Sequence, residues 1–384
     1  MAKEIELKLA LSPHHVGALL QHPLFQQPEI QAAGTHRLCN TYFDTVEQAL
    51  QGAKIALRIR QIGKRYIQTL KTRGQSKAGL HQRNEWEWEL DQPSLDFSLL
   101  TETAWHTALD NPPAADALHP AFSTDFERQL WHYCSTNSAG EPVEIEIALD
   151  SGEVRVELDG QQRTDPLSEL ELELKQGQPG DLFDLALLLA RAIPLQICDI
   201  SKAERGYRLY APDQYQVRLE RPQLPADITL EEAYVALLQF ELQSWPRHME
   251  AWQFSHKWEH GSHALDSLHN IRALREHFID VAPLSADDEL GQLVDKLIDR
   301  LQTLLSWRRC SQLLGPHAAE WTRQEAEKAS TRLEVLSQTK EASLIALLLG
   351  EKLSKRPWRA RWNDQHQQRA AAPLQPPAPS AEPA

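Results

Sequence analysis

Charged side chains recur at every second position in several short segments of the first half of the chain. In order, these segments carry Glu4, Glu6 and Lys8; Arg58 and Arg60; Lys71 and Arg73; Glu85 and Glu87; Glu144 and Glu146; and Glu169, Glu171 and Glu173. Residues two apart share one face of a β-strand, so each segment predicts a strand with one charged face. Guanidinium and ammonium groups bind phosphate oxygens, and paired carboxylates bind hard divalent cations. These segments could therefore hold an anion and a metal ion.

The opposite faces of the same segments are apolar. They carry Ile5, Leu7, Ile59, Trp86, Trp88, Ile145, Leu170, Leu172 and Leu174. A sheet with one solvated face explains any single segment of this kind, but so much apolar surface has to be covered. If helices cover it, a closed sheet turns the charged faces inward. Buried charges without partners are costly, so we expect a ligand or water to fill this interior, and its lining suits a polyphosphate with a divalent cation.

Alternation and spacing predict the secondary structure around these residues. Period-two alternation predicts strands at 4–9, 56–62, 66–73, 84–90, 142–149, 154–158 and 169–175. Helices are expected between them at 12–22 and 180–192. Beyond residue 211, apolar residues recur every three or four positions, which predicts helices at 229–243, 261–278, 288–305 and 322–336. We therefore expect an α+β first half with an antiparallel sheet, followed by an all-α domain.

The composition changes where these two patterns meet. We expect a first domain at 1–210, a linker at 211–226, a helical domain at 227–362 and a tail at 363–384. Pro212, Pro222 and Pro225 mark the linker. Thr229 and Glu232 have the spacing of a capping box, which predicts a helix start just after it. The tail is rich in Ala and Pro, and we expect it to be disordered.

The charge and cysteine content limit the classes of partner. The 384-residue chain has a formal net charge of −14, which argues against a protein that binds nucleic acid through a basic surface. It contains no apolar run of membrane-spanning length, so no membrane partner is expected. The four cysteines are widely scattered, which suits neither a disulfide framework nor a zinc site. We expect a cytoplasmic protein.

The segment Glu4-Ile5-Glu6-Leu7-Lys8 resembles the ExExK signature of the CYTH, or triphosphate tunnel metalloenzyme, superfamily. The order of the following segments is similar to that family as well, and the resemblance covers about residues 1–210. The further matching segments lie at 40–45, 56–60, 70–72, 83–87, 126–128, 144–146, 150–152, 169–173 and 201–202. The resemblance implies an eight-stranded antiparallel β-barrel with flanking helices, a tunnel that binds a linear triphosphate and a divalent metal ion.

The resemblance also implies roles for individual residues. It implies phosphate binding by Lys8, Arg58, Arg60, Lys71, Arg128 and Lys202, and metal binding and catalysis by Glu4, Glu6, Glu171 and Glu173, with Mg²⁺ expected and Mn²⁺ as the alternative. Lys8 would also take part in catalysis, by orienting the attacking water or removing its proton. It implies tunnel-lining positions without an assigned role for Arg73, Glu85, Glu87, Glu144, Glu146, Asp150 and Glu169. Arg128 could equally form a structural ion pair, and Lys202 could be a surface lysine.

The second half contains a weaker resemblance. His269 and Arg272 lie one helical turn apart and are similar to the His-x-x-Arg helix of the CHAD family, which implies polyphosphate binding. The domain is shorter than that family usually builds, so we expect a truncated or degenerate version. An ordinary solvated helix face explains the same two residues. The basic stretch at 352–362 could contact polyphosphate or nucleic acid, but a solvated helix end explains it better.

Three classes of function remain open on the sequence. The first is an inorganic triphosphatase, which the arrangement of a CYTH-like and a CHAD-like domain favours. The second is another CYTH chemistry, either ATP cyclisation as in class IV adenylyl cyclases or thiamine triphosphate hydrolysis. The third is a polyphosphate-binding module without catalysis. The two carboxylate pairs, Glu4 with Glu6 and Glu171 with Glu173, favour an enzyme, since anion binding alone has no need of them.

Overall fold

The computed structural model describes residues 3–72, 74–77, 80–101, 103–109, 111–317 and 319–374. The side chain of Glu4 and the whole of Arg73 lie outside the described parts. The chain divides into two compact units, Met1–Gln216 and Val217–Ala384. Within the described residues, no helix is long and apolar enough to cross a membrane.

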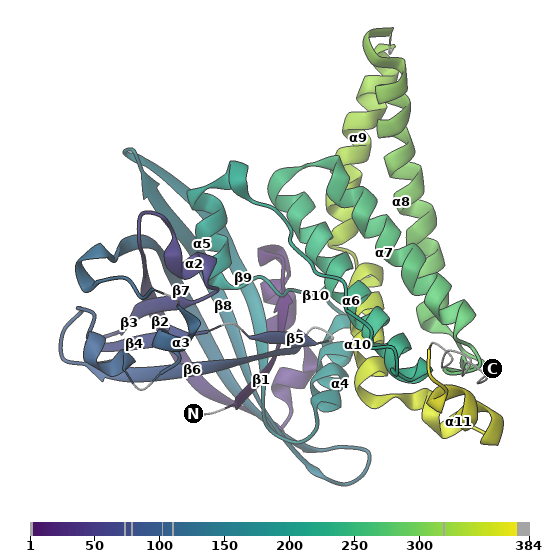
Figure 1. Ribbon diagram of the computed structural model, residues 1–384, viewed down its shortest axis with the longest axis horizontal. Coiled ribbons are helices and arrows are strands. Elements are labelled where there is room, and N and C mark those ends of the chain that lie inside the picture. The colour runs from purple at the N-terminus through teal and green to yellow at the C-terminus, as the bar shows by residue number, and fades with distance from the viewer. Residues whose placement is uncertain are drawn as a thin grey trace, which may run out of the picture. The chain divides into compact units, whose positions relative to one another are not determined.

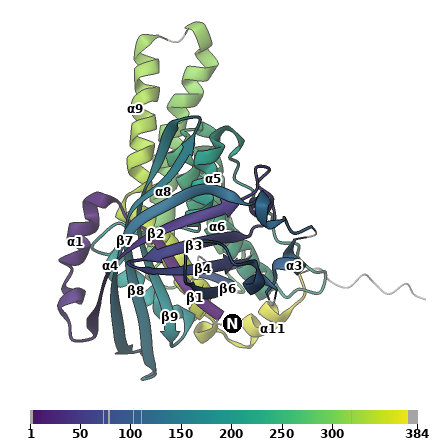
Figure 2. The ribbon, with the colours of Figure 1, turned by 90° about the vertical axis from the view of Figure 1, so that its left-hand side faces the viewer.

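The first unit is built around one antiparallel sheet (Figures 1 and 2). Its strands are β1 (Lys3–Ala10), β2 (Ile30–Asp44), β3 (Ala56–Ile62), β4 (Arg65–Lys71), β5 (Gln75–Lys77), β6 (Leu80–Leu90), β7 (His119–Thr136), β8 (Pro142–Leu158), β9 (Gln161–Gln176) and β10 (Gln196–Ile197). They are ordered β10-β1-β9-β8-β7-β2-β3-β4-β6-β5, and β1 also pairs with β6. That pairing joins eight strands into the expected barrel, to which the short β5 and β10 are added.

The strand predictions needed two corrections. β2 and β7 were not predicted from alternation, because residues 31–37 of β2 are exposed whatever their parity. The predicted strands at 142–149 and 154–158 are one continuous strand, β8, which pairs with β7 and β9 along its length.

Helices cover the apolar outer face of the barrel. Leu57 and Leu70 lie against Trp105 in a buried cluster beside the short helices α2 (Ala49–Gly52) and α3 (Trp105–Ala108). The helix α4 (Pro179–Ala190) packs on β1 and β9, and it buries Leu182 and Phe183 completely. Each such side chain contributes roughly 1.5–3 kcal/mol through burial. The expected inside-out arrangement, with apolar residues outside and charges inside, is confirmed. The predicted helix at 12–22 is formed by a 3-10 turn, Pro13–His15, and α1 (Val16–Leu20).

The helix α5 (Lys202–Tyr210) lies against the inner face of the barrel wall. Ser201 begins the helix by accepting a hydrogen bond from the backbone N–H of Glu204. Gly206 lies so close to the Phe122 ring that an added Cβ would overlap it. Phe122 is on β7 and, by strand alternation, faces the same side as Arg128. Therefore α5 closes one end of the barrel interior and brings Lys202 into it.

The second unit is helical. It contains α6 (Leu230–Ser255), α7 (Trp258–His277), α8 (Glu289–Leu314), α9 (Glu320–Ser337), α10 (Lys340–Lys355) and α11 (Asp364–Ala371). Its core includes Trp245, Trp252 and Ile345, all fully buried. The capping box from Thr229 to Glu232 is present, as the spacing predicts. Figure 1 shows α8 and α9 side by side as a hairpin.

The expected disorder from residue 363 is wrong for residues 363–374. Asn363 caps α11 through its side chain, and Ala370 of this helix is buried. After the helix, the backbone of Leu374 donates a hydrogen bond to the carbonyl of Ile228. Ala has a high helix propensity, so an Ala-containing segment with a good cap forms a helix when a surface is present to receive it. Residues 375–384 lie outside the described chain.

Candidate active site

The strand register places the predicted carboxylates in rows across β1, β9 and β8. Glu6 lies opposite Glu173, which lies opposite Glu146. One step deeper, Lys8 lies opposite Glu171. Asp150 and Glu169 are paired in the next row. Because residues two apart on a strand share a face, these rows form one continuous charged surface inside the barrel.

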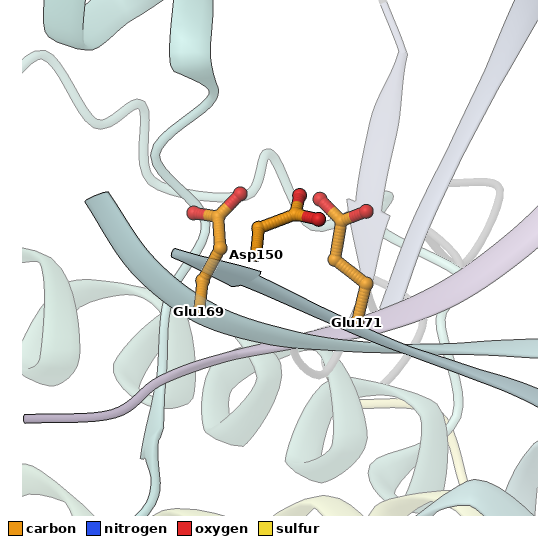
Figure 3. Close-up of side chains that lie close together, drawn as sticks. All are labelled: Asp150, Glu169 and Glu171. Carbon is orange, nitrogen blue, oxygen red and sulfur yellow. The ribbon is translucent and has the colours of Figure 1, made fainter. Parts of the chain in front are cut away.

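The deepest part of this surface is a buried cage of opposite charges. Asp150 and Glu169 are 0% exposed, and Lys8 and Lys202 are 5% and 7% exposed. The Lys202 ammonium contacts Glu169, and its Nζ lies 2.7 Å from Asp150 and 3.0 Å from Glu171. Figure 3 shows the three carboxylates of Asp150, Glu169 and Glu171 on one side of the sheet.

Arg128 and Lys8 complete the cage. The Arg128 guanidinium donates to both oxygens of Asp150 at 2.7 Å and to Glu171 at 2.5 Å. The Lys8 ammonium lies 3.3 Å from Glu171 and 3.9 Å from Glu169. Arg128 therefore forms the ion pair that was one of its two predicted roles, and phosphate binding by Arg128 stays a prediction. Lys202 is not a surface lysine.

The charges in the cage shift the pKa values of Glu171, Lys8 and Lys202. Burial by itself raises the pKa of Glu171, but the positive charges of Lys202, Arg128 and Lys8 outweigh it and hold that pKa well below its usual value. Burial lowers the pKa of Lys8, but Glu169, Glu171 and Glu6 more than offset this and raise it. The pKa of Lys202 is raised in the same way by Asp150, Glu169 and Glu171. At neutral pH the lysines of the cage are ammonium ions.

A second group of cations lies on β3 and β4. The buried Arg58 donates to the Tyr42 hydroxyl at 3.2 Å and lies 3.6 Å from Glu85, which also contacts Lys71 at 2.5 Å. Thr69, also on β4, donates to Glu87 at 3.1 Å. Arg58, Lys71, Glu85 and Glu87 were predicted to line the same interior, and the structure brings them together.

Arg60 stands out within this group. Burial and the positive charges of Arg58 and Arg128 lower the pKa of Arg60 to about 10. Its guanidinium donates to the side-chain oxygen of Asn40 at 2.9 Å. Arg60 is therefore a cation whose own surroundings oppose its charge, which is the electrostatic condition of an anion-binding site.

Two residues near these arginines had no predicted role. Asn40 is buried and bridges Arg60 and Thr124 through its side chain. Tyr42 is buried, stacks on Phe122 and accepts the hydrogen bond from Arg58. Both lie in the matching segment at 40–45, so the signal was present, but only the pairing of β2 with β3 and β7 shows which groups they position.

The remaining predicted residues lie toward the outer part of the surface. Lys175 lies 2.6 Å from Glu173 and 3.8 Å from Glu146. Glu144 is exposed and adjoins an irregularity in the register of β8 and β9, so it is not part of the cage.

The carboxylates can accommodate a metal ion. Oxygen atoms of Asp150, Glu169 and Glu171 all lie within 4.8 Å of one another, and Oε2 of Glu169 is buried without a hydrogen-bond partner among the described residues. Lys202 contacts all three of these carboxylates. Carboxylate oxygens are the ligands that Mg²⁺ prefers, so the donor set fits the expected ion class.

The sequence match extends over the whole of this barrel. The family model of the CYTH domain matches residues 2–207. The chain belongs to the CYTH family. An inorganic triphosphatase from Haemophilus influenzae is 35% identical over 209 residues, which are 54% of this chain and 55% of that relative. This chain therefore spans about half the length of that curated relative. The CYTH match ends before the helical unit, for which the resemblance to CHAD stays a prediction.

Solved structures give weaker similarities. One is a Hippeastrum protein named as an adenylyl cyclase and described as having a dominant triphosphatase activity. It is 23% identical, and the alignment covers 56% of this chain and 97% of the Hippeastrum chain, with a TM-score of 0.37. A Pyrococcus horikoshii protein is 15% identical, covers 55% of this chain and 99% of its own, and has a TM-score of 0.31. With scores this low, the family assignment rests on the sequence match.

The predicted polyphosphate residues of the helical unit contact each other. Arg272 lies 3.1 Å from Nδ1 of His269, whose Nε2 lies 3.0 Å from Gln302. Arg272 also lies 3.6 Å from Asp295. In the basic stretch, Arg359 donates to both oxygens of Glu231. These contacts agree with a structural role, and polyphosphate binding here stays a prediction.

Proposed function

We propose that this chain hydrolyses inorganic triphosphate to pyrophosphate and phosphate inside the barrel, with a divalent metal ion. The observation that carries the proposal is the group of cations on β3 and β4 that faces the barrel interior, in which burial and the charges of Arg58 and Arg128 lower the pKa of Arg60. A bound polyphosphate would relieve that repulsion. The identity with the inorganic triphosphatase over the barrel supports the same substrate class.

The two faces of the interior have different tasks in this proposal. Arg58, Arg60 and Lys71 on β3 and β4 bind phosphate oxygens, with guanidinium groups able to donate two parallel hydrogen bonds. Lys8, Arg128 and Lys202 approach from the opposite wall and from α5. Because Lys8 and Lys202 stay protonated, they stabilise negative charge on the phosphate oxygens and do not remove a proton from water.

The outer row of carboxylates is the better place for the metal ion. The cage already balances Asp150, Glu169 and Glu171 against Lys8, Arg128 and Lys202. In the outer row, Lys175 contacts Glu146 and Glu173, and Glu6 lies opposite Glu173. We therefore assign the metal to Glu6 and Glu173 of the outer row and to Glu171 of the adjoining row, with Glu4 as the further predicted ligand. We expect Mg²⁺, with Mn²⁺ as the alternative. A bound Mg²⁺ would supply charge neutralisation and a lower pKa for the attacking water.

The proposal is tested by comparing substrates. Phosphate release would be measured from inorganic triphosphate, ATP, thiamine triphosphate and long polyphosphate, each with and without Mg²⁺, for the wild type and Glu6→Gln. We expect Mg²⁺-dependent release from triphosphate that falls at least about tenfold in Glu6→Gln, as when a metal site is disturbed.

Other outcomes would identify the alternatives. Consumption of ATP without phosphate release would indicate cyclisation. Faster phosphate release from thiamine triphosphate than from inorganic triphosphate would indicate a thiamine triphosphatase. Binding of triphosphate without turnover of any substrate would indicate a polyphosphate-binding module. Any of these results contradicts the proposed function. A cytoplasmic location remains a prediction alongside it.

A further inference from the structure

Three polar side chains form one row across three neighbouring strands of the barrel. In the register of the sheet, Asn40 on β2 lies opposite Arg60 on β3 and opposite Thr124 on β7. Residues directly opposite each other in antiparallel strands share a face, so all three side chains are on the inner side of the barrel wall. Asn40 and Thr124 are 1% and 0% exposed. The row therefore joins a predicted phosphate ligand, Arg60, to two buried and uncharged residues.

The hydrogen bonds along this row fix the orientation of each group. Nε of Arg60 donates to Oδ1 of Asn40 at 2.9 Å, and Nδ2 of Asn40 donates to the hydroxyl of Thr124 at 2.9 Å. A guanidinium group has donors and no acceptor, so the amide oxygen of Asn40, and not its nitrogen, has to face Arg60. The amide nitrogen then faces Thr124, whose hydroxyl accepts. Thr124 thus holds the Asn40 amide, and Asn40 holds the Arg60 guanidinium.

Arg60 differs from the other described cations of the interior because it has no acidic partner. The others all form ion pairs with carboxylates, namely Lys8, Arg58, Lys71, Arg128, Lys175 and Lys202. Among the described residues, Arg60 forms no ion pair, and its side chain donates only to Asn40. Glu87, whose charge acts on Arg60, instead accepts a hydrogen bond from Thr69 and lies 3.9 Å from Arg58. The terminal nitrogens of Arg60 are therefore available to a ligand.

A neutral acceptor at position 40 matters for an anion-binding site. The amide oxygen of Asn40 orients the guanidinium but leaves its charge uncompensated. A carboxylate in the same place would form a charge-assisted ion pair with Arg60 and would compete with phosphate. The like charges of Arg58 and Arg128 add to the positive potential at Arg60. The row thus maintains an unpaired positive charge that a polyphosphate can neutralise.

We propose that Asn40, held by Thr124, is a positioning residue that orients Arg60 and keeps its charge unpaired for a phosphate oxygen of the substrate. This inference rests on the proposed function, because it states how that site binds its polyphosphate. Asn40 and Thr124 act through Arg60 and take no part in the chemistry.

The test uses substitutions that keep the shape of the row. Asn40→Asp replaces the neutral acceptor by a charged one, and the Thr124 hydroxyl can turn to donate to the new carboxylate, so no buried group loses its partner. Thr124→Val removes the acceptor of the amide nitrogen, and Thr124→Ser retains it. Asn111→Asp is the matched control, because it adds the same charge at an exposed position of the first unit.

Three measurements on the full chain separate binding, turnover and stability. Calorimetry without Mg²⁺ measures the binding of inorganic triphosphate apart from its hydrolysis. Steady-state kinetics with Mg²⁺ give KM and kcat for the same compound, and thermal unfolding gives the melting temperature of each variant.

We expect Asn40→Asp to weaken triphosphate binding and to raise KM by about ten- to a hundredfold, as for the loss of one charge-assisted hydrogen bond. Its melting temperature should rise, because Arg60 gains an ion-pair partner. Thr124→Val should raise KM with a smaller change in kcat, whereas Thr124→Ser and Asn111→Asp should match the wild type.

The outcomes also separate this inference from the proposed function. Hydrolysis with the same KM in Asn40→Asp and the wild type overturns the inference and leaves the function in place. A fall in the melting temperature of Asn40→Asp, or an unchanged KM in Thr124→Val, overturns it as well. Triphosphate binding without hydrolysis in the wild type, with that binding lost in Asn40→Asp, supports the inference and contradicts the function.

Discussion

Arg60 lies beside two other guanidinium groups inside the barrel. Because these groups repel it, we expect its replacement to weaken triphosphate binding without lowering the stability of the fold. In Arg60→Gln, the glutamine can still reach Asn40, and the repulsion from Arg58 and Arg128 disappears. We expect the free energy of unfolding to change by less than about 1 kcal/mol, while loss of a charge-assisted hydrogen bond of about 1.5–3 kcal/mol raises KM for triphosphate roughly ten- to a hundredfold.

Chemical denaturation and steady-state kinetics measure the two effects. Arg155→Gln is the matched control, because Arg155 pairs with Glu153 on the exposed surface of the first unit. A structural role for Arg60 would instead appear as a large loss of stability with unchanged KM in the folded fraction.

Glu171 makes the stability of the barrel dependent on pH. Its folded-state pKa is held well below the ordinary value of about 4.3, chiefly by the charges of Lys202, Arg128 and Lys8 acting against burial. A lowered carboxyl pKa contributes stability that is fully present above the unfolded-state pKa and is lost as pH falls through the folded-state pKa. We therefore expect the free energy of unfolding to decline as pH falls below about 4.3.

Denaturant unfolding at a series of pH values checks this expectation. In Glu171→Gln the decline should be shallower, whereas Glu144→Gln, which alters an exposed carboxylate, should follow the wild type. Identical slopes in all three proteins would show that Glu171 does not carry the effect.

At the scale of elements, α5 is the part that completes the site. The helix supplies Lys202, and Gly206 lets it lie on the Phe122 ring. In Gly206→Ala, the added methyl group would overlap that ring and displace the helix. We expect a loss of about 1–3 kcal/mol in the free energy of unfolding, the usual cost of overpacking, together with reduced triphosphatase activity.

Gly17→Ala is the control for this prediction. Gly17 also lies in a helix, α1, but no described neighbour lies within 4 Å of its added Cβ, so the substitution should stabilise the protein by about 0.5–1 kcal/mol. Equal effects of the two substitutions on thermal unfolding and activity would mean that the contact between α5 and Phe122 does not position the site.

The elements differ in how well the sequence predicts them. β1, β3 and β9 alternate cleanly because one face meets helices and the other meets the charged interior. β2 was missed because its first half is exposed throughout, so its identity as a strand depends on pairing with the distant β7. Its partner β7 matched the family only through a short segment.

At the scale of the whole molecule, the contacts that the sequence did not predict join elements far apart in the chain. Alternation placed Glu171 on the charged face, but the central positions of Asp150 and Glu169 follow from Lys202, which reaches them from a separate helix. Such long-range charge pairing leaves no local pattern. The folded tail of the second unit was missed for the same reason, since α11 forms where residues 228–229 lie beside residues 373–374.

The most direct test of the account is product analysis of inorganic triphosphate incubated with the full chain, followed by phosphorus NMR with and without Mg²⁺. The account predicts equal amounts of pyrophosphate and phosphate, formed only when Mg²⁺ is present. Intact triphosphate in the presence of Mg²⁺, even where it binds to the barrel, would contradict the assignment of this interior to hydrolysis.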